Sequence, residues 1–430
     1  MSVTVLSQDG NCFTLKVCVD PSNVFLTTEE KIQDAVNKIG SLLTSQALKA
    51  LDSDGRPITV NDERLTSKGL HHKVYQSPYG SVEVDRHIYQ TARGGETYCP
   101  LEKCAGMVIT FTPKFAKMLT SKVSGTNTRE VIRDLRENHG RPIALSHAQK
   151  IVDFVGSMAQ AADEAWTYET PKPDAPVKTV AIGVDGAHML MVQDGWRQAM
   201  VGTIALYDRL GERLHTTYIG ASPELGRETF IRRMEKEIAT VKREFPRALF
   251  MGIADGAPTN WEFLEKHTEV QVLDFYHATE YLTGVANVVF PVDKDAREDW
   301  LQKACHRMKH DRGGARTNVK MISTLRNSRK LKKDEDKVLE GAANYFRNNL
   351  PRMNYQLQVS CNRPIGSGVT EAACKVIIKQ RLCGSGMRWK PEGAGAIISL
   401  RCLNQSDARW DHFWKKSQDV GYPDGWSSTS

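Results

Sequence analysis

Two aspartates in the sequence each close an apolar stretch and precede a glycine. Asp185 closes VKTVAIGVDG (177–186), and Asp255 closes ALFMGIADG (248–256). Carboxylates at neighbouring strand ends can share a metal ion, and the glycine lets backbone and substrate approach closely. A single Asp-Gly pair at a strand end is more commonly a turn or a cap. The prediction of one shared site therefore depends on the two aspartates occurring together.

A glutamate later in the chain supplies a third acid. Glu371 lies near the start of a predicted helix over 368–382, after the Gly-Ser-Gly turn of IGSGVTEAAC. Acidic residues from separate segments are the ligands that Mg²⁺ or Mn²⁺ requires, and two such ions about 3.5–4 Å apart can hold the attacking and leaving oxygens of a phosphodiester. We therefore predict Asp185, Asp255 and Glu371 as catalytic metal ligands for two ions. The alternative for Glu371 is a favourable charge near a helix start.

Two further acids compete for the metal. Asp194 falls in VQDGW and is predicted to be a turn residue, whereas Asp274 lies on or just after a strand and is predicted as an additional metal contact. The nine cysteines contain no C-x-x-C, and Cys99 and Cys104 have no second pair. No zinc site is predicted, because a structural zinc ion requires four ligands.

Hydrophobic periodicity and turn residues indicate the elements that must position these acids. The predicted order is strands over 177–186, 197–208 and 213–221, a helix over 224–245, a strand over 248–256, a helix over 258–267 and a strand over 270–278. Three strands as an antiparallel meander, then helix and strand, is the order of a ribonuclease-H-like fold. The predicted class is α/β, with a ribonuclease-H-like mixed-sheet core at 177–278 and 365–416. Residues 279–364 are predicted to be an all-helical insertion, and 399–416 a final amphipathic helix.

The N-terminal part is predicted to hold two different regions. Residues 1–120 are predicted to be β-rich, from the alternation in 81–90 and 106–115. Residues 121–169 are predicted to form a helix-turn-helix, with a first helix capped by Thr126 or Thr128 and ending at Gly140, and a second capped by Ser146. The first turn of the second helix would bind DNA through His147, Gln149 and Lys150. Helical hairpins also occur in proteins that do not bind DNA, and three prolines in 170–178 mark a domain boundary.

Positive charge is concentrated in the C-terminal third. Residues 301–420 contain 24 Lys and Arg against 10 Asp and Glu, although the whole chain carries a net charge of +7. This asymmetry favours a polyanionic partner, and the alternative is a solvated basic surface. Trp389 is predicted either to stack on an unpaired base or to lie in the core. The cations predicted to hold DNA phosphates beside Glu371 are Lys375, Lys379, Arg381, Arg388 and Lys390.

Four segments resemble the bacterial insertion-sequence transposases of the ISKra type. They are GVDGA (183–187), IADGA (253–257), DFYHATEYL (274–282) and IGSGVTEAACKVIIKQRLCGSGMRW (365–389), within a resemblance that covers about residues 75–415. The family belongs to the Asp-Asp-Glu group, and the resemblance implies that its three metal-binding acids are Asp185, Asp255 and Glu371. It also implies a helical insertion between the second and third acids. The Asp-x-x-His element of related superfamilies falls on Asp274 and His277, and His277 is predicted either to act at the scissile phosphate or to make a structural hydrogen bond.

The predicted function is therefore DNA transposition. The enzyme would bind double-stranded DNA at the terminal repeats of its element, hydrolyse it there, and join the freed 3′-hydroxyl to target DNA as a homo-oligomer. One alternative is a ribonuclease-H-like structure-specific nuclease, and another is a domesticated, non-catalytic DNA-binding protein. Tyr276 and Tyr281 stay open as nucleophiles of another recombinase chemistry. We expect no membrane partner and a cytoplasmic, nucleoid-associated protein, because the sequence has neither a bilayer-length apolar run nor a secretory signal.

Overall fold

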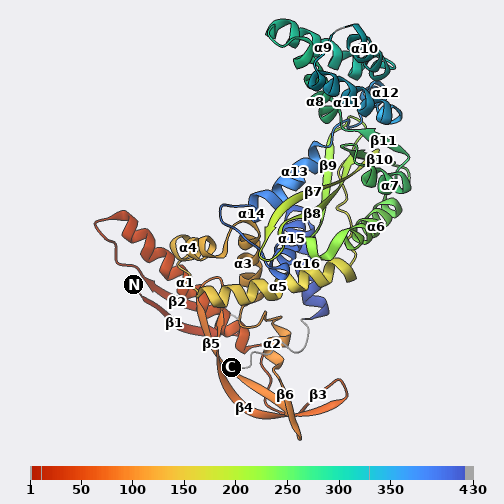
Figure 1. Ribbon diagram of the computed structural model, residues 1–430. Helices are drawn as coiled ribbons and strands as arrows, with labels where there is room; N and C mark the ends of the chain where they lie inside the picture. The colour runs from red at the N-terminus through yellow and green to blue at the C-terminus, as the bar shows by residue number, and fades with distance from the viewer. Residues whose placement is uncertain (1, 11, 329, 422–430) are drawn as a thin grey trace. The chain divides into compact units, whose positions relative to one another are not determined.

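This mixed α/β chain divides into two units, and each of them contains β-sheet (Figure 1). The computed structural model describes residues 2–10, 12–328 and 330–421. The first unit comprises Met1–Ala159 with Trp410–Ser430, and the second comprises Gln160–Arg409. Helix α5 (Leu145–Ala165) runs from the first unit into the second.

The first unit contains two antiparallel sheets and several helices. Strands β1 (Ser2–Asp9) and β2 (Cys12–Cys18) form a hairpin, followed by α1 (Phe25–Lys49). The second sheet has its strands in sequence order: β3 (Ile58–Val60), β4 (Glu63–Gln76), β5 (Ser81–Thr91) and β6 (Gly94–Tyr98). The helices that follow are α2 (Pro100–Cys104), α3 (Pro113–Gly125), α4 (Thr128–His139) and α5.

The predicted strand over 81–90 is confirmed as β5, but two other features of the first 120 residues differ from the prediction. The 25-residue helix α1 was not predicted. Residues 106–115 form no regular strand, because Ile109 has a positive φ of 60° and the chain reverses there. The backbones of Val108 and Phe111 pair across this turn at 2.9 Å. The alternating apolar side chains therefore reflect a buried turn, not an extended strand.

The two helices of the predicted helix-turn-helix are present as α4 and α5. Helix α4 ends at Gly140, which adopts the left-handed conformation with φ 60°, as its position predicts. Its N-cap is Asn127, whose side chain accepts from the backbone N–H of Glu130 at 3.0 Å. The caps predicted at Thr126 or Thr128 and at Ser146 are therefore wrong, since α5 begins one residue before Ser146.

A five-stranded mixed sheet forms the centre of the second unit. Strands β7 (Thr179–Met191), β8 (Gly195–Tyr207) and β9 (Arg213–Ala221) form an antiparallel meander. Strands β10 (Leu249–Ala254) and β11 (Val270–Leu273) continue the sheet parallel to β7, which gives the order β11-β10-β7-β8-β9. Helices α6 (Gly226–Glu244) and α7 (Pro258–His267) connect β9 to β10 and β10 to β11. This order of elements confirms the predicted one.

Two strand ends differ from the predicted ends. Strand β7 continues to Met191, because residues 186–191 keep pairing with β8, so Asp185 lies inside the strand and not at its end. Strand β11 stops at Leu273, and Asp274 is the N-cap of α8 (Phe275–Val289).

Helices cover both faces of this sheet. On one face, Gly202 of β8 lies against Met234 of α6, and Gly252 of β10 lies against Leu264 of α7. A side chain at either glycine would collide with the helix, so both glycines permit close helix–sheet packing.

The opposite face of the sheet is covered by the segment after residue 367. Gly183 of β7 lies against Thr370 of α13 (Gly368–Ala373). Helix α13 continues through a π-helix (Cys374–Lys379) into α14 (Gln380–Leu382). Gly220 of β9 lies against Ile398 of α15 (Pro391–Gln405).

A purely helical segment separates β11 from α13 in the described part of the chain. Its apolar side chains belong to the same buried cluster as those of the sheet, including Leu282, Ile322, Leu339 and Phe346. The helices that follow α8 are α9 (Lys294–His310), α10 (Gly314–Ser328), α11 (Lys333–Asn349) and α12 (Tyr355–Ser360), shown in green to blue in Figure 1.

The end of the chain contains two helices where one was predicted over 399–416. Helix α15 ends at Gln405 and α16 (Arg409–Val420) begins after a turn at Asp407, which has a positive φ of 46°. No helix in the described residues is both long enough and apolar enough to span a bilayer.

Candidate functional site

Asp185 lies on the face of β7 that α13 covers. Successive side chains of a strand point to opposite faces, and Gly183, two residues earlier, already lies against Thr370 of α13. One carboxylate oxygen of Asp185 accepts from the backbone N–H of Gly186 at 2.7 Å, and the other accepts from the Cys374 thiol at 3.4 Å. Burial, together with the charge of Asp185, raises the pKa of Cys374 well above its usual range, so the thiol stays protonated and can donate.

Glu371 and Asp185 line the same hollow. Glu371 is exposed in the first turn of α13, and its carboxylate lies 3.0 Å from the Ser367 hydroxyl. The hollow has a volume of about 750 Å³, and its other charged lining residues are Lys375 and Lys379. The fold therefore brings two of the three predicted acids together, with two lysines beside them.

The position of Glu371 is fixed by its neighbour Thr370. The Thr370 hydroxyl is 2.7 Å from the hydroxyl of Thr203 on β8, and both are buried. Thr370 occupies the space that a side chain at Gly183 would fill. Helix α13 can therefore approach the sheet closely only because β7 has a glycine at this point.

The π-helix that follows Glu371 is stabilised by a buried arginine. A π-helix replaces i→i+4 hydrogen bonds by i→i+5 bonds, and such segments are frequent at functional sites. The guanidinium of Arg401, on α15, donates to the carbonyl oxygen of Val376 within the π-helix, at 3.0 Å from its Nε. Burial lowers the pKa of Arg401. This contact supplies a partner to a carbonyl of the irregular turn.

Asp255 directly follows β10, the strand that pairs with β7 next to Asp185. Strands β10 and β7 pair in parallel with Ile253 opposite Gly183, so two residues later Asp255 follows the same register as Asp185. Its carboxylate is exposed and accepts from the backbone N–H of Ala257 at 3.2 Å. The Tyr345 hydroxyl of α11 donates to the backbone carbonyl of Asp255 at 2.8 Å, which connects the helical segment to this loop.

Asp185, Asp255 and Glu371 have the ligand type of a Mg²⁺ or Mn²⁺ site, but they do not form a complete site. Among the described residues, no three His, Cys, Asp or Glu side chains lie close enough together to hold a metal ion. Carboxylate oxygens are nevertheless the ligands that Mg²⁺ and Mn²⁺ prefer. Asp185 and Glu371 already share a hollow, and the exposed side chain of Asp255 would have to turn toward them to complete a triad.

Asp274 is fully buried and its carboxylate is occupied by hydrogen bonds. One oxygen accepts from the backbone N–H of His277 at 2.7 Å, as an N-cap does. The other oxygen accepts from both the backbone N–H and the hydroxyl of Ser367, the hydroxyl at 2.5 Å. These contacts favour a role in holding the loop before α13 over the predicted role in metal contact.

His277, Tyr281 and Tyr345 form an aromatic cluster near the Asp255 loop. The His277 Nδ1 is 3.2 Å from the Glu280 carboxylate, and its ring packs edge-on against Tyr281 and Tyr345. The rings of Tyr281 and Tyr345 stack with centroids 3.8 Å apart. Burial raises the pKa of Tyr345, so its hydroxyl stays protonated. Tyr276 is exposed and lies against Gly366.

The predicted DNA-binding residues after Glu371 fall into two groups. Lys375 and Lys379 are exposed at the hollow, and Arg388 and Lys390 are also exposed. Glu371 and Lys375, both described, form no ion pair with each other.

Arg381 and Trp389 form the second group, and they pack on each other. Arg381 is buried with its guanidinium 5.2 Å from the centre of the Trp389 ring. The indole N–H of Trp389 donates to the carbonyl of Leu382 at 2.9 Å, and its backbone pairs with the end of β7. This arrangement favours the core alternative for Trp389 over base stacking.

In the first unit, the predicted DNA-contacting residues of α5 differ in exposure. His147 is partly buried, 2.6 Å from the Thr110 hydroxyl and edge-on to Phe111, and burial lowers its pKa. The Gln149 side chain accepts from Thr128 and donates to Asp153, and Lys150 is exposed. Their role in DNA binding stays a prediction.

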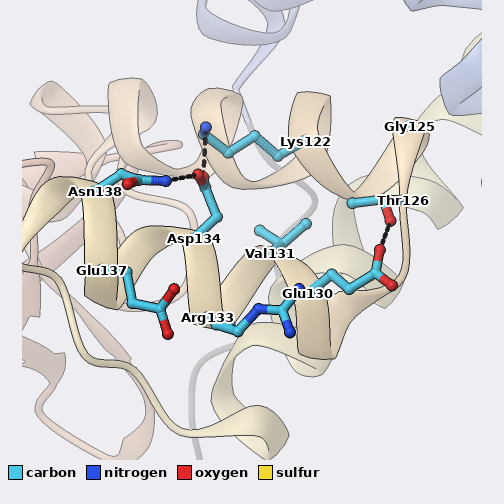
Figure 2. Close-up of a pocket in the computed structure, with 9 residues that line it drawn as sticks. All are labelled: Lys122, Gly125, Thr126, Glu130, Val131, Arg133, Asp134, Glu137 and Asn138. Atoms are coloured by element: carbon cyan, nitrogen blue, oxygen red, sulfur yellow. Dashed lines mark hydrogen bonds and ion pairs between the residues drawn. The ribbon is translucent and has the colours of Figure 1, made fainter.

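A second hollow, of about 470 Å³, lies between α3 and α4. Figure 2 shows Lys122 of α3 and Asn138 of α4 both reaching the carboxylate of Asp134. The hydrogen bond from Lys122 is the main cause that lowers the pKa of Asp134. Lys122 is neutralised by this pair, and the charge of Arg133 is outweighed by Glu130 and Glu137, so the hollow is not suited to phosphate.

Sequence reasoning missed four residues that position the acids: Ser367, Thr370, Cys374 and Arg401. Ser367 had a local signal, because a serine just before a helix commonly accepts or donates hydrogen bonds there. The other three had none, since their partners are 25 to 189 residues away in the sequence.

Comparison with known proteins found no match: no model of a protein family matches this chain, and neither does any curated protein. The functional assignment therefore depends on the geometry of the site and on the motifs in the sequence.

Proposed function

We propose that this chain is a metal-dependent DNA transposase with a ribonuclease-H-like catalytic core. The observation that carries the proposal is the hollow that Asp185 of β7 and Glu371 of α13 line together with Lys375 and Lys379. Two acids from distant segments, next to free cations, suit a substrate that is itself a phosphodiester, because the acids bind metal and the lysines bind phosphate.

The arrangement of elements supports the ribonuclease-H-like part of the proposal. A meander of three antiparallel strands, extended by two parallel strands on the side of the first, is the order that this fold requires, and here it is β11-β10-β7-β8-β9. Asp185 lies on β7, and Asp255 directly follows the adjacent strand β10, which pairs in parallel with β7. Helix α13 brings Glu371 to the same face after the helical segment.

Each residue then has a definite task. Asp185, Asp255 and Glu371 would hold two Mg²⁺ or Mn²⁺ ions, which when bound supply an activated water and stabilise charge on the scissile phosphate. The Cys374 thiol and the Gly186 N–H fix the orientation of the Asp185 carboxylate. Lys375 and Lys379 hold phosphates of the DNA end. A freed 3′-hydroxyl then attacks target DNA, with no covalent bond between protein and DNA.

Transposition also defines the partners. The protein would bind double-stranded DNA at both ends of its element and at a target, and two paired ends require at least two active sites, which favours a homo-oligomer. We propose that it acts in the bacterial cytoplasm, on nucleoid DNA.

The test is an assay of end cleavage and strand joining with purified protein, Mg²⁺, duplexes from the two DNA flanks of the gene and a target plasmid. We expect the wild type to nick and join these ends. Asp185→Asn, Asp255→Asn and Glu371→Gln should each lower the rate by at least about 100-fold, since removal of one preorganised charged group commonly has this effect. Asp194→Asn is the control, because Asp194 is exposed in a turn and, among the described residues, its one ion pair is with Arg197.

Three results would contradict the proposal in different ways. Full activity of the three acid variants would reject the site. Cleavage of branched DNA without strand joining would favour the structure-specific nuclease, and end binding without cleavage at any metal concentration would favour a non-catalytic DNA-binding protein.

A further inference from the structure

The turn between α9 and α10 forms a rigid helical hairpin. Gly313 has a positive φ of 73°, and Gly314 lies so close to the backbone of Arg307 that no side chain fits there. The buried side chain of Asn318 joins the two helices, donating to the carbonyl of Ala304 at 2.9 Å and accepting from Arg307 at 3.0 Å. The surface of this hairpin therefore has a fixed shape.

This hairpin has a strong excess of positive charge. Residues 301–328 contain seven Lys and Arg and one acid, Asp311. Three of the seven cations have partners: Lys303 pairs with Asp299, Arg307 with Asn318, and Arg326 with Asp336 and Glu340.

The remaining four cations are Lys309, Arg312, Arg316 and Lys320. In the described part of the chain, none of them has a carboxylate within 4.0 Å. Arg312, Arg316 and Lys320 are exposed and Lys309 is partly exposed. We call these four residues the hairpin surface. A group of cations without acidic neighbours raises the local potential, and an anionic partner would lower it.

The spacing of the hairpin surface suits a regular polyanion. Arg316 and Lys320 are four residues apart, so they lie on one side of α10, about 6 Å apart along its axis. Arg312 lies in the turn just before α10, which begins at Gly314. The distance of about 6 Å between Arg316 and Lys320 is close to the rise of two nucleotides on one DNA strand.

The chemistry of the hairpin excludes two other polyanions. The apolar residues between the cations, such as Ala315, Val319 and Ile322, are buried, so no apolar side chain of this helix face could enter a membrane. Residues 301–328 contain no Phe, Tyr or Trp, whereas binding of single-stranded nucleic acid relies on aromatic stacking.

We propose that the hairpin surface binds the phosphate backbone of duplex DNA, as a contact separate from the hollow of Asp185 and Glu371. The proposal rests on the proposed function for its choice of DNA among polyanions. The contact would be independent of sequence, because it involves phosphates and no base edges. It would hold the DNA on the helical segment while the acids act on the scissile bond.

The test measures equilibrium binding of a fluorescent duplex of arbitrary sequence in EDTA, so that no cleavage is needed. Arg312→Glu/Arg316→Glu should weaken binding by about 10- to 100-fold at 0.1 M salt, and the slope of log K against log salt should become shallower by about 1.8, since each lost phosphate contact removes about 0.9. The control Lys294→Glu/Lys303→Glu makes the same change in charge on α9, at lysines that already pair with acids, and should change binding less than threefold.

The outcomes separate this inference from the proposed function. A charge-reversed protein that melts like the wild type and binds duplex with the same affinity and salt slope overturns the inference. The inference is also overturned if the control Lys294→Glu/Lys303→Glu loses as much affinity for the duplex as Arg312→Glu/Arg316→Glu does. If the charge reversal weakens binding of single-stranded RNA but leaves binding of duplex DNA unchanged, DNA is rejected as the partner. If the duplex effect occurs as expected but no ends are cleaved in Mg²⁺, the inference stands and the transposase proposal fails.

Discussion

Replacement of Asp274 by alanine tests whether this buried carboxylate organises the loop before Glu371. The change removes the N-cap of α8 and the acceptor for two donors of Ser367. Asp293 offers a matched comparison, since it caps α9 in the same way, at 2.9 Å from the N–H of Ala296, but is exposed.

The expected magnitudes differ because the two caps differ in burial. Loss of an N-cap costs about 1 kcal/mol, and this is the whole expected effect of Asp293→Ala. Asp274→Ala should cost more, because a buried donor left without an acceptor adds about 1–3 kcal/mol. The sum for Asp274→Ala is about 2–4 kcal/mol. Asp274→Asn should fall between the two, since its amide oxygen can still cap α8 while its NH₂ faces the donors of Ser367.

The assay is urea denaturation of the three variants and the wild type. The free energies of unfolding in water are compared with the dependence of the free energy on urea concentration held at a common value. A second readout is the Mg²⁺ concentration at half-maximal cleavage, which should rise in Asp274→Asn because Glu371 shares Ser367 with Asp274. The reasoning is refuted if Asp274→Ala is no more destabilising than Asp293→Ala, or if Asp274→Asn abolishes metal binding outright, as the loss of a direct ligand would.

Two other predictions concern packing and pH. Gly183→Ala places a methyl group against Thr370 and should destabilise the protein by about 1–3 kcal/mol; Thr370→Ala should recover part of this in the double variant, and a purely additive double variant would contradict the packing argument. Burial lowers the pKa of His215, so the unfolded chain takes up this proton at a higher pH than the folded chain, and stability should fall as the pH drops below about 6.5. Urea titrations at pH 7.5 and 5.5 should show a smaller loss in His215→Gln than in the wild type, by up to about 1.4 kcal/mol per pH unit, and equal losses would exclude His215 as a cause.

The order of elements in the second unit could be predicted because its signals are local. Apolar runs, helical periodicity and Pro246 or Pro258 at element boundaries each depend on neighbouring residues. The strand containing Asp185 was predicted too short, because its second half, GAHMLM, alternates small and polar residues with apolar ones and is recognisable only by its pairing with β8. The strand predicted over 106–115 was wrong for the opposite reason. A turn at Ile109 buries apolar side chains whose order in the sequence resembles that of a strand.

The candidate site was predictable in its residue types but not in its contacts. Asp185, Asp255 and Glu371 follow from their positions in predicted elements, and two of them line one hollow. The role of Asp274 depends on Ser367, which is 93 residues away, so no local pattern could distinguish a metal ligand from a buried acceptor. The same limit applies to Trp389 and Arg381, whose mutual packing no local pattern could reveal.

The π-helix at Cys374–Lys379 predicts how the chain tolerates a change in length. Because i→i+5 bonding takes more residues per turn than i→i+4 bonding, this segment contains one residue more than an α-helix of the same length. Deletion of a single residue here can convert the segment to a regular α-helix and leave Glu371 and the pairing of Trp389 with β7 in place. The same deletion in a regular helix turns every later side chain by about 100°, which would move a buried face into solvent.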